Sequence, residues 1–230
     1  MQQRLKPLKP KKYKGHQVNY IDKKGVQHIE LNRGCKRNCI FCHADPDYKV
    51  FPVPEIKSNL VQIIGEGVLY DPEINQKIIG LGEKRVHNKV IYYGISQGVD
   101  LRLLTREQAE LLCMYRFGLI NKKAKWYKGI RIAWDWGRKQ EELVYKTIEM
   151  LVNVGYKRNK IIVFMLVNWK IDFKTCLYKF KKCQEWGVKV DDCTWECTKR
   201  NFIPLHWTVK EYKTFRRMVR QHDIDVNLGK

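Results

Sequence analysis

The chain lacks any long hydrophobic run. Its longest uninterrupted apolar stretch covers residues 161–167, whereas a helix that spans a bilayer needs about 20 apolar residues. The basic N-terminus is not followed by an apolar stretch, so the sequence shows no secretory signal. These absences argue against a transmembrane or secreted protein, and we expect a cytoplasmic location.

Acidic residues are scarce. The 230 residues include 24 Asp and Glu against 45 Lys and Arg, which gives a formal net charge of +21. A charge of this size favours an anionic partner, and we expect nucleic acid or a nucleotide rather than a membrane. A merely solvated basic surface is the alternative, because charge indicates partners and not chemistry.

No acidic residue precedes Asp22. Residues 1–17 form a basic N-terminal arm, either extended along a phosphate backbone or solvated as a tail, with these cations: Arg4, Lys6, Lys9, Lys11, Lys12 and Lys14. Residues 18–230 are expected to form one core domain, since 44% of the chain is apolar and no internal repeat or linker interrupts it.

Strand and helix patterns alternate through this core. Strands are predicted at residues 26–31, 60–64, 90–93, 130–134, 161–167 and from 188 onward. Helices are predicted weakly at 73–87, from Thr105 through Leu119, at 139–155, at 172–187 and at 208–221, with capping boxes at Thr105 and Thr208. Six β-α units predict an α/β fold with a mainly parallel sheet, as an open barrel or a doubly wound sheet.

The sharpest feature is a cysteine cluster. Cys35, Cys39 and Cys42 lie within eight residues after the first predicted strand. In a reduced compartment clustered cysteines are typical of metal ligands, and soft thiolates select zinc, copper(I) or an iron–sulfur cluster. Structural zinc needs four ligands, and His43 is poorly placed to be the fourth because it adjoins Cys42. A four-iron cluster held by three cysteines leaves one iron open to bind a small molecule.

This C-x3-C-x2-C motif, with Phe41 before its last cysteine, resembles the signature of the radical S-adenosylmethionine (radical SAM) superfamily. The resemblance covers about residues 24–222. Gly65 and Glu66 stand where the superfamily has a glycine-rich turn that holds the SAM amine, although this turn departs from the usual Gly-Gly-Glu-Pro. Residues 96–105 and 132–135 resemble segments of a small subgroup of phage and microbial type.

The resemblance implies a partial (β/α)6 barrel of the TIM-like radical SAM type. It implies that Cys35, Cys39 and Cys42 bind a [4Fe–4S] cluster and that SAM chelates the open iron. It further implies reductive cleavage of SAM to a 5′-deoxyadenosyl radical, which abstracts hydrogen from a substrate, and an electron donor of flavodoxin or ferredoxin type. The backbone of Phe41 is expected to meet the adenine.

Ligands of parallel β-α folds bind at the carboxyl ends of the strands. The candidate cofactor residues there are Gly65, Glu66, Gln97, Asp135 and Asn168, with Asp100, Asp191 and Asp192 as further candidates. Capping of the next helix is the alternative for these side chains, and Asp100 has a second alternative, an ion pair with Arg102. Arg131 lies inside a strand, and the sequence leaves its direction open.

The other cysteines have weaker signals. Cys193 and Cys197 are predicted just after the sixth strand, as ligands of an auxiliary cluster, as a radical relay or hydrogen donor, or simply as loop and buried thiols. Cys176 and Cys183 share one helix face, and Cys113 is predicted in the core.

Several basic and aromatic residues are predicted at the surface or near the site. Lys179, Lys181 and Lys182 are predicted on an exposed helix face. Residues 121–128 mix lysines with aromatics and are predicted as a solvated loop or a docking surface. Trp195 and Trp207 are candidates for stacking on substrate or closing the pocket.

Two other functions remain open. One is a radical SAM enzyme that modifies a peptide or protein. The other is a non-enzymatic, metal-stabilised nucleic-acid-binding protein, which the net charge would serve equally well.

Overall fold

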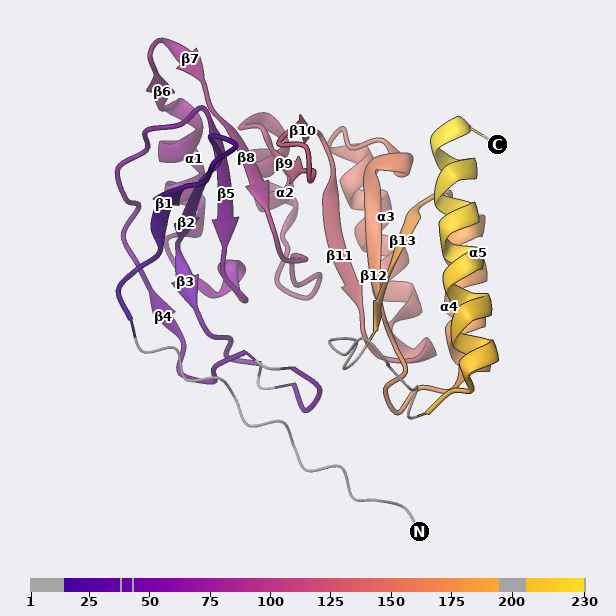
Figure 1. Cartoon of the computed structure of the whole chain (residues 1–230). Coiled ribbons are helices and arrows are strands. Elements are labelled where there is room, and N and C mark those ends of the chain that lie inside the picture. The colour runs from indigo at the N-terminus through magenta and orange to yellow at the C-terminus, as the bar shows by residue number, and fades with distance from the viewer. Residues whose placement is uncertain (1–14, 38, 43, 195–205, 230) are drawn as a thin grey trace. The chain divides into compact units, whose positions relative to one another are not determined.

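The computed structural model describes residues 15–37, 39–42, 44–194 and 206–229 (Figure 1). The chain divides into two compact units. The first unit is Met1–Gln97 with Tyr115–Tyr127, and the second is Gly98–Met114 with Lys128–Lys230. Within the described part of the chain, no helix has the length and apolar character needed to cross a membrane.

The first unit is built on a six-stranded sheet in the order β1-β2-β5-β8-β9-β10. These strands are Asn19–Ile21, Gln27–Glu30, Leu60–Ile64, Tyr92–Ile95, Phe117–Ile120 and Trp126–Tyr127. The four inner strands are parallel, and β1 and β10 are antiparallel edges. Helix α1 (Ile74–Glu83) buries Ile78 and Leu81, and the short 3-10 helix η1 (Val68–Tyr70) precedes it.

Two short hairpins complete this unit. Strands β3 (Asn32–Arg33) and β4 (Lys49–Val50) pair with each other, as do β6 (Arg85–Val86) and β7 (Lys89–Val90). The second hairpin falls where the sequence predicted the end of a helix and the start of a strand. His87 and Asn88 form its turn with positive φ angles.

The second unit has a parallel three-stranded sheet of β11 (Ile130–Trp134), β12 (Ile161–Val167) and β13 (Lys189–Thr194). Its helices are α2 (Arg106–Met114), α3 (Glu141–Asn153), α4 (Phe173–Glu185) and α5 (Val209–Leu228), with 3-10 turns at Arg138–Gln140 and Arg158–Lys160. Strand β12 is buried on both faces apart from Phe164, as its continuous apolar run predicted. Both predicted capping boxes form.

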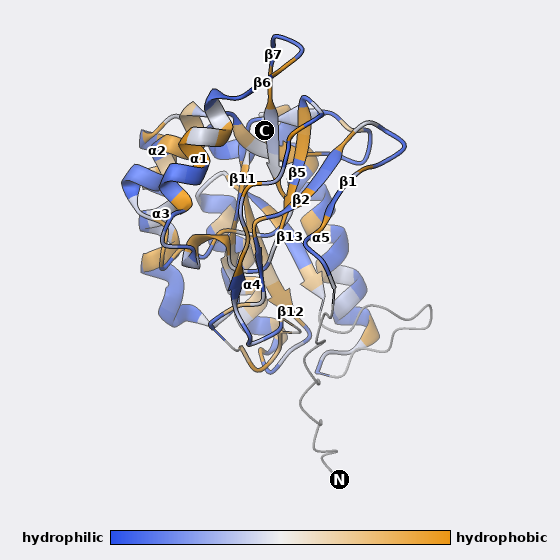
Figure 2. Cartoon of the chain, turned by 90° about the vertical axis from the view of Figure 1, so that its left-hand side faces the viewer, coloured by the Kyte–Doolittle hydropathy of each residue, from blue (hydrophilic) through white to orange (hydrophobic). Residues whose placement is uncertain are grey.

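Figure 2 colours the chain by the hydropathy of each residue. Helices α1, α2 and α3 each carry both hydrophilic and hydrophobic residues, as helices that cover a sheet on one side do. In the second unit, Phe180 of α4 packs against Phe215 and His222 of α5, so these two helices share one apolar contact.

Strand β9 is one of several strands that the sequence analysis missed, and it lies where a helix was predicted. The apolar spacing predicted a helix from Thr105 through Leu119, but α2 ends at Met114 and Leu119 lies in β9. Arg116 adopts a left-handed conformation with φ of 60°, which stops the helix. The next residues pair with β8, with Gly94 opposite Gly118, so tertiary strand pairing overrides a local helical pattern.

The basic and aromatic segment at 121–128 is a hairpin rather than a loop. Asn121 begins a tight turn between β9 and β10, and the side chain of Asn121 accepts hydrogen bonds from the Lys123 and Lys125 backbones. The Trp126 indole of β10 reaches past β9 and donates to the Tyr93 carbonyl of β8. Trp126 is therefore part of the sheet, while the turn lysines are exposed.

The prediction that Lys179 is exposed was wrong. Lys179 is 0% exposed, and its ammonium donates to the Trp134 carbonyl at 2.5 Å. Burial away from water lowers the pKa of Lys179 to about 8, against the favourable charges of Cys176 and Asp135. The helix face that it shares with Cys176 and Cys183 points toward the sheet, and Lys181 is the exposed member of the predicted trio.

Replacing Lys179 tests this burial. Between about pH 8 and pH 10.5 the unfolded chain holds the Lys179 proton and the folded chain does not, so the contribution of Lys179 to the free energy of unfolding rises with pH. The unfolding free energy of the natural protein minus that of Lys179→Met should therefore rise from pH 7.5 to pH 10.5. Urea unfolding at each pH measures it.

The matched control is Lys181→Met, which alters an exposed lysine two positions away on the same helix. Its difference from the natural protein should stay flat over the same range. A flat difference for Lys179→Met as well would show that Lys179 titrates as an exposed lysine does.

Candidate metal-binding loop and cofactor residues

The three clustered cysteines lie on the loop of residues 34–48, which we call the cysteine loop. It leaves the sheet just after β2 and is closed at its base by the β3–β4 pair, with Arg33 opposite Lys49. Within the loop the Cys35 N–H donates to the Asp45 carbonyl at 2.8 Å, and the Cys42 N–H donates to the Cys39 carbonyl at 2.9 Å. The cysteines are thus carried by a hydrogen-bonded turn.

Gly34 makes the sharp entry into this loop. Its φ is +77°, and a Cβ built there would lie 2.5 Å from the Asp45 carbonyl oxygen and 2.7 Å from that of Asp47. No other residue fits this position without displacing the loop. Asp45 is itself buried, and its carboxylate accepts the Asp47 N–H, so the far side of the turn is held as well.

Glu66 joins the cysteine loop to the turn that follows β5. Its carboxylate accepts the Gly34 N–H at 3.0 Å, one residue before Cys35. Tyr48, near the end of the loop, donates to the Gly67 carbonyl at 3.1 Å. The structure therefore brings together the two features that the sequence singled out separately, the first cysteine and the Gly65–Glu66 turn.

The two glycines of this turn give the loop space. Gly65 has a φ of +151°, and a Cβ there would lie 2.4 Å from the Asn32 side-chain oxygen. A Cβ on Gly67 would lie 3.5 Å from the Cys35 sulfur and 3.0 Å from the Tyr70 ring. Asn32 is fully buried, and its Oδ1 has no hydrogen-bond partner among the described residues.

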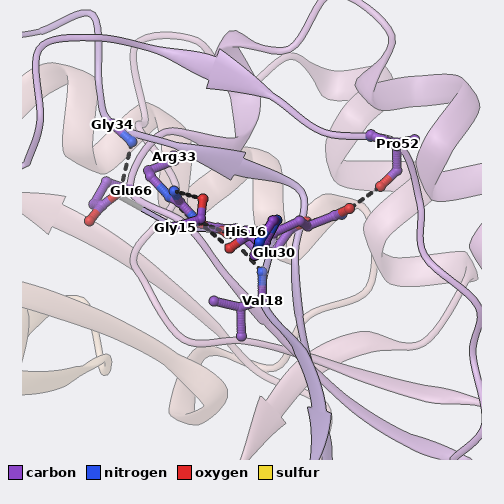
Figure 3. Close-up of polar contacts among 9 residues, drawn as sticks. Gly15, His16, Val18, Glu30, Arg33, Gly34, Pro52 and Glu66 are labelled. Carbon is purple, nitrogen blue, oxygen red and sulfur yellow. Dashed lines mark hydrogen bonds and ion pairs between the residues drawn. The ribbon is translucent and has the colours of Figure 1, made fainter. Parts of the chain in front are cut away.

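A buried ion pair anchors the other side of the loop base (Figure 3). Arg33 contacts both carboxylate oxygens of Glu30, at 2.8 and 2.6 Å. The same guanidinium donates to the carbonyls of Gly15 and His16, and Glu30 accepts the Val18 N–H. The sequence analysis did not identify this pair; its one signal was the position of Arg33 beside the cysteine motif.

The thiols of the cysteine loop differ from those of α4. Cys35 and Cys39 are half-buried and Cys42 is exposed, and none of the three forms a disulfide. Cys176 and Cys183 are fully buried, and burial raises the pKa of both thiols, that of Cys176 to about 11. The thiols of the cysteine loop are therefore more accessible than those of α4.

No group of three or more His, Cys, Asp or Glu side chains in the described ranges is arranged to hold a metal ion. The prediction for His43 lies outside the described residues. Thiolate ligands must lose their protons to bind, and metal binding is therefore coupled to the local arrangement of the chain.

Two further candidates belong to the first unit. Phe41 is half-buried on the cysteine loop, directly before Cys42. Gln97 is exposed, two residues beyond the end of β8, as predicted. Ser96 lies between the end of β8 and Gln97. Its hydroxyl donates to the Ile63 carbonyl, which ties the end of β8 to β5.

The second unit presents a polar face on its sheet. Arg131, Phe164 and Cys193 alternate with residues that face α4 and α5, and the Arg131 guanidinium lies 5.3 Å from the Phe164 ring centre. Asp191 pairs in register with Phe164. Asp191, Asp192 and Cys193 thus lie inside β13 and not after it, which corrects the prediction, because the strand continues four residues past Val190.

Asp135 directly follows β11, as predicted. Burial raises its carboxyl pKa, while Lys179 and Arg102 oppose the shift. Asp100 forms a bidentate ion pair with Arg102, at 2.7 and 2.8 Å, so the pairing alternative for Asp100 is confirmed.

Asn168 follows β12 and is fully buried, with a left-handed φ of 61°. Its side-chain oxygen accepts the His206 N–H at 3.0 Å, which is a structural role. Its side-chain nitrogen has no hydrogen-bond partner in the described part of the chain. A buried donor of this kind costs free energy unless a ligand or water satisfies it.

Several weaker candidates have structural roles. Asp192 forms an ion pair with Arg216 of α5 at 2.8 Å. Trp207 is buried against Phe173 and Phe215 and donates to the Ile171 carbonyl, so it is a core residue. Cys113 is half-buried and donates to the Val154 carbonyl. The predictions for Cys197 and Trp195 lie outside the described residues.

Comparison with known proteins does not identify a family for the chain. A scan against models of protein families gives no match, and a search of curated proteins gives no significant match either.

Replacing Glu66 tests its role at the loop base. Glu66→Ala removes the acceptor of the Gly34 N–H and leaves that donor unpaired, so the free energy of unfolding should fall by about 1–3 kcal/mol. Amide hydrogen exchange over residues 34–48 should speed up in the same variant. Glu66→Gln keeps an oxygen acceptor and should retain most of the protection.

The matched control is Glu83→Ala, which removes an exposed carboxylate from the same unit. It should leave exchange in the cysteine loop unchanged. If Glu66→Ala behaves like Glu83→Ala, the carboxylate does not anchor the loop.

Proposed function

We propose that the protein is a radical SAM enzyme that holds a [4Fe–4S] cluster through Cys35, Cys39 and Cys42. One observation carries the proposal: three accessible cysteines at C-x3-C-x2-C spacing lie on a loop that leaves a parallel strand and is bonded to the turn after the next strand. The motif implies a partial (β/α)6 barrel of the radical SAM type, and each unit contains parallel strands of the kind that such a barrel uses. These are β2, β5 and β8 in the first unit and β11, β12 and β13 in the second.

The donor set suits such a cluster. Three thiolates from one short segment are typical iron–sulfur ligands. Gly67 leaves space beside the Cys35 sulfur that any side chain would fill. The entry through Gly34 and the anchors from Glu30, Arg33 and Glu66 hold the loop at its first end, and the Tyr48 hydroxyl holds its other end, while the thiols stay accessible.

When bound, the cluster would supply one electron for the cleavage of SAM to a 5′-deoxyadenosyl radical, which abstracts a hydrogen atom from the substrate. The chain's own residues do the positioning. We assign Glu66 to orient the cysteine loop through the Gly34 N–H, which is a different role from direct contact with the SAM amine. Phe41, Gly65, Gln97, Asp135 and Asn168 remain proposed cofactor contacts.

Nucleic acid or a nucleotide is the substrate class that we favour, because the net charge of +21 suits a phosphate-bearing partner. The electron would come from a small protein of flavodoxin or ferredoxin type. A peptide substrate is the second candidate within the same chemistry. A non-enzymatic metal-stabilised nucleic-acid-binding protein is the rival from another class.

Anaerobic reconstitution separates these functions. The natural protein should bind about four irons per chain and release 5′-deoxyadenosine from SAM after reduction. Cys39→Ala should lose the cluster and the cleavage, while its far-ultraviolet circular dichroism stays that of the folded chain, because Cys39 is on a loop and not in the core.

Cys113→Ala is the matched control, since Cys113 is also half-buried but lies on α2. It should keep both the iron content and the cleavage. Full activity in Cys39→Ala, or a tetrahedral zinc signature with no iron uptake in the natural protein, contradicts the proposal.

A further inference from the structure

Four exposed cations form a straight line along α5, which we call the α5 stripe: Lys210, Lys213, Arg217 and Arg220. Their spacing of three, four and three residues returns to the same side of a helix with 3.6 residues per turn. The opposite side of α5 is the buried one, formed by Phe215, Val219, His222 and Val226. The α5 stripe therefore faces solvent over about 15 Å of helix.

The acidic residues of α5 lie outside the stripe. Glu211 belongs to the capping box with Thr208, Asp223 accepts the Val190 N–H, and Asp225 accepts the Gln221 amide. Among the described residues, no carboxylate forms an ion pair with any of the four stripe cations, whereas the neighbouring Arg216 is paired with Asp192. The charge of the stripe is thus not neutralised within the part of the chain that the structure describes.

This arrangement is unfavourable for the isolated helix. Like charges three or four residues apart repel each other, and the stripe contains three consecutive pairs of this kind. Lys210 and Lys213 also lie in the first turns of α5, where the helix dipole favours anions. A polyanion laid along the stripe would remove both penalties at once.

We propose that the α5 stripe binds the phosphodiester backbone of a nucleic acid. A strand carries about one phosphate per 3.4 Å of helix axis, so the 15 Å stripe spans about four phosphates and offers four cations. The stripe contains no base-reading pattern, so it would position the strand rather than select its sequence. This deepens the proposed function by naming its partner, and it depends on that function only for the claim that the nucleic acid is the substrate.

A membrane surface fits the stripe less well. Helices that lie on a bilayer insert their apolar face, and the apolar face of α5 is already buried in the second unit. Val209, Ile224 and Leu228 are the exposed large apolar residues of α5, and they lie at the two ends of the helix and not in one continuous apolar face. We therefore favour nucleic acid and treat anionic vesicles as a competing outcome of the test.

The test compares two variants with the same change in net charge. The stripe variant is Lys210→Gln, Lys213→Gln, Arg217→Gln and Arg220→Gln. The control variant removes four scattered exposed cations, Lys23→Gln, Lys84→Gln, Lys139→Gln and Lys157→Gln. Fluorescence anisotropy of a labelled single-stranded RNA is measured from about 50 to 200 mM salt, with phosphatidylserine vesicles as the second probe.

The slope of log affinity against log salt should become shallower by up to about 3 in the stripe variant, since each phosphate contact with a single strand contributes about 0.7. Affinity at low salt should fall at least about tenfold. The control variant should change the slope by less than about 1. Equal effects of the two variants, no RNA binding by the natural protein, or loss of vesicle binding alone would each overturn the proposal.

Further measurements separate RNA binding from effects on folding and from SAM cleavage. Removing like-charge neighbours should leave the thermal midpoint of the stripe variant unchanged or raised, and the double variant Arg217→Gln, Arg220→Gln should show about half of the change in slope. Binding is measured with the full chain before and after cluster reconstitution. RNA binding through the stripe without SAM cleavage contradicts the proposed enzyme and supports the proposed RNA-binding surface. SAM cleavage together with an RNA affinity that the stripe variant leaves unchanged supports the enzyme and contradicts the surface.

Discussion

The cysteine loop depends on a small set of polar contacts at its base, of which the Glu30–Arg33 pair is buried. The Glu66 carboxylate accepts the Gly34 N–H, and the Glu30–Arg33 pair holds the neighbouring residue from the other side. Each contact takes a charge or a backbone donor out of water, so its partner must be present or the loop base is destabilised. These contacts hold the loop where the chain enters it and leave its three thiols accessible. Such a division suits a site whose ligands must first lose protons and then adjust to a metal.

The second unit uses burial in another way. Lys179 places a charge beneath the carbonyl end of β11, where Asp135 emerges into a partly desolvated setting. Asn168 leaves a buried amide nitrogen without a partner among the described residues, at the end of the adjacent strand. Unsatisfied or strongly shifted groups concentrate where a protein meets a ligand. Asp135 and Asn168 both lie at the carboxyl ends of strands, which is where parallel β-α proteins place their ligands.

Much of the fold was predictable from local patterns. The buried strand β12, the caps of α4 and α5, and the positions of Glu66, Asp135 and Asn168 just after their strands all followed from apolar runs and capping residues. Strand β9 was not predictable, because Leu119 continues a helical spacing and pairing with β8 overrides it. The Lys179 prediction failed for a related reason: a lysine in a lysine-rich helix gives no local sign that its face meets a sheet.

By itself the sequence determined the spacing of three cysteines, the large positive charge and the order of strands and helices, since these depend on residue identity and short-range periodicity. The tertiary structure alone decided that Glu66 and Arg33 hold the cysteine loop through contacts with distant residues and that the cations of α5 lie on one line facing solvent. These are contacts between distant segments or consequences of which helix face is buried. Such facts arise from packing, which local sequence does not encode.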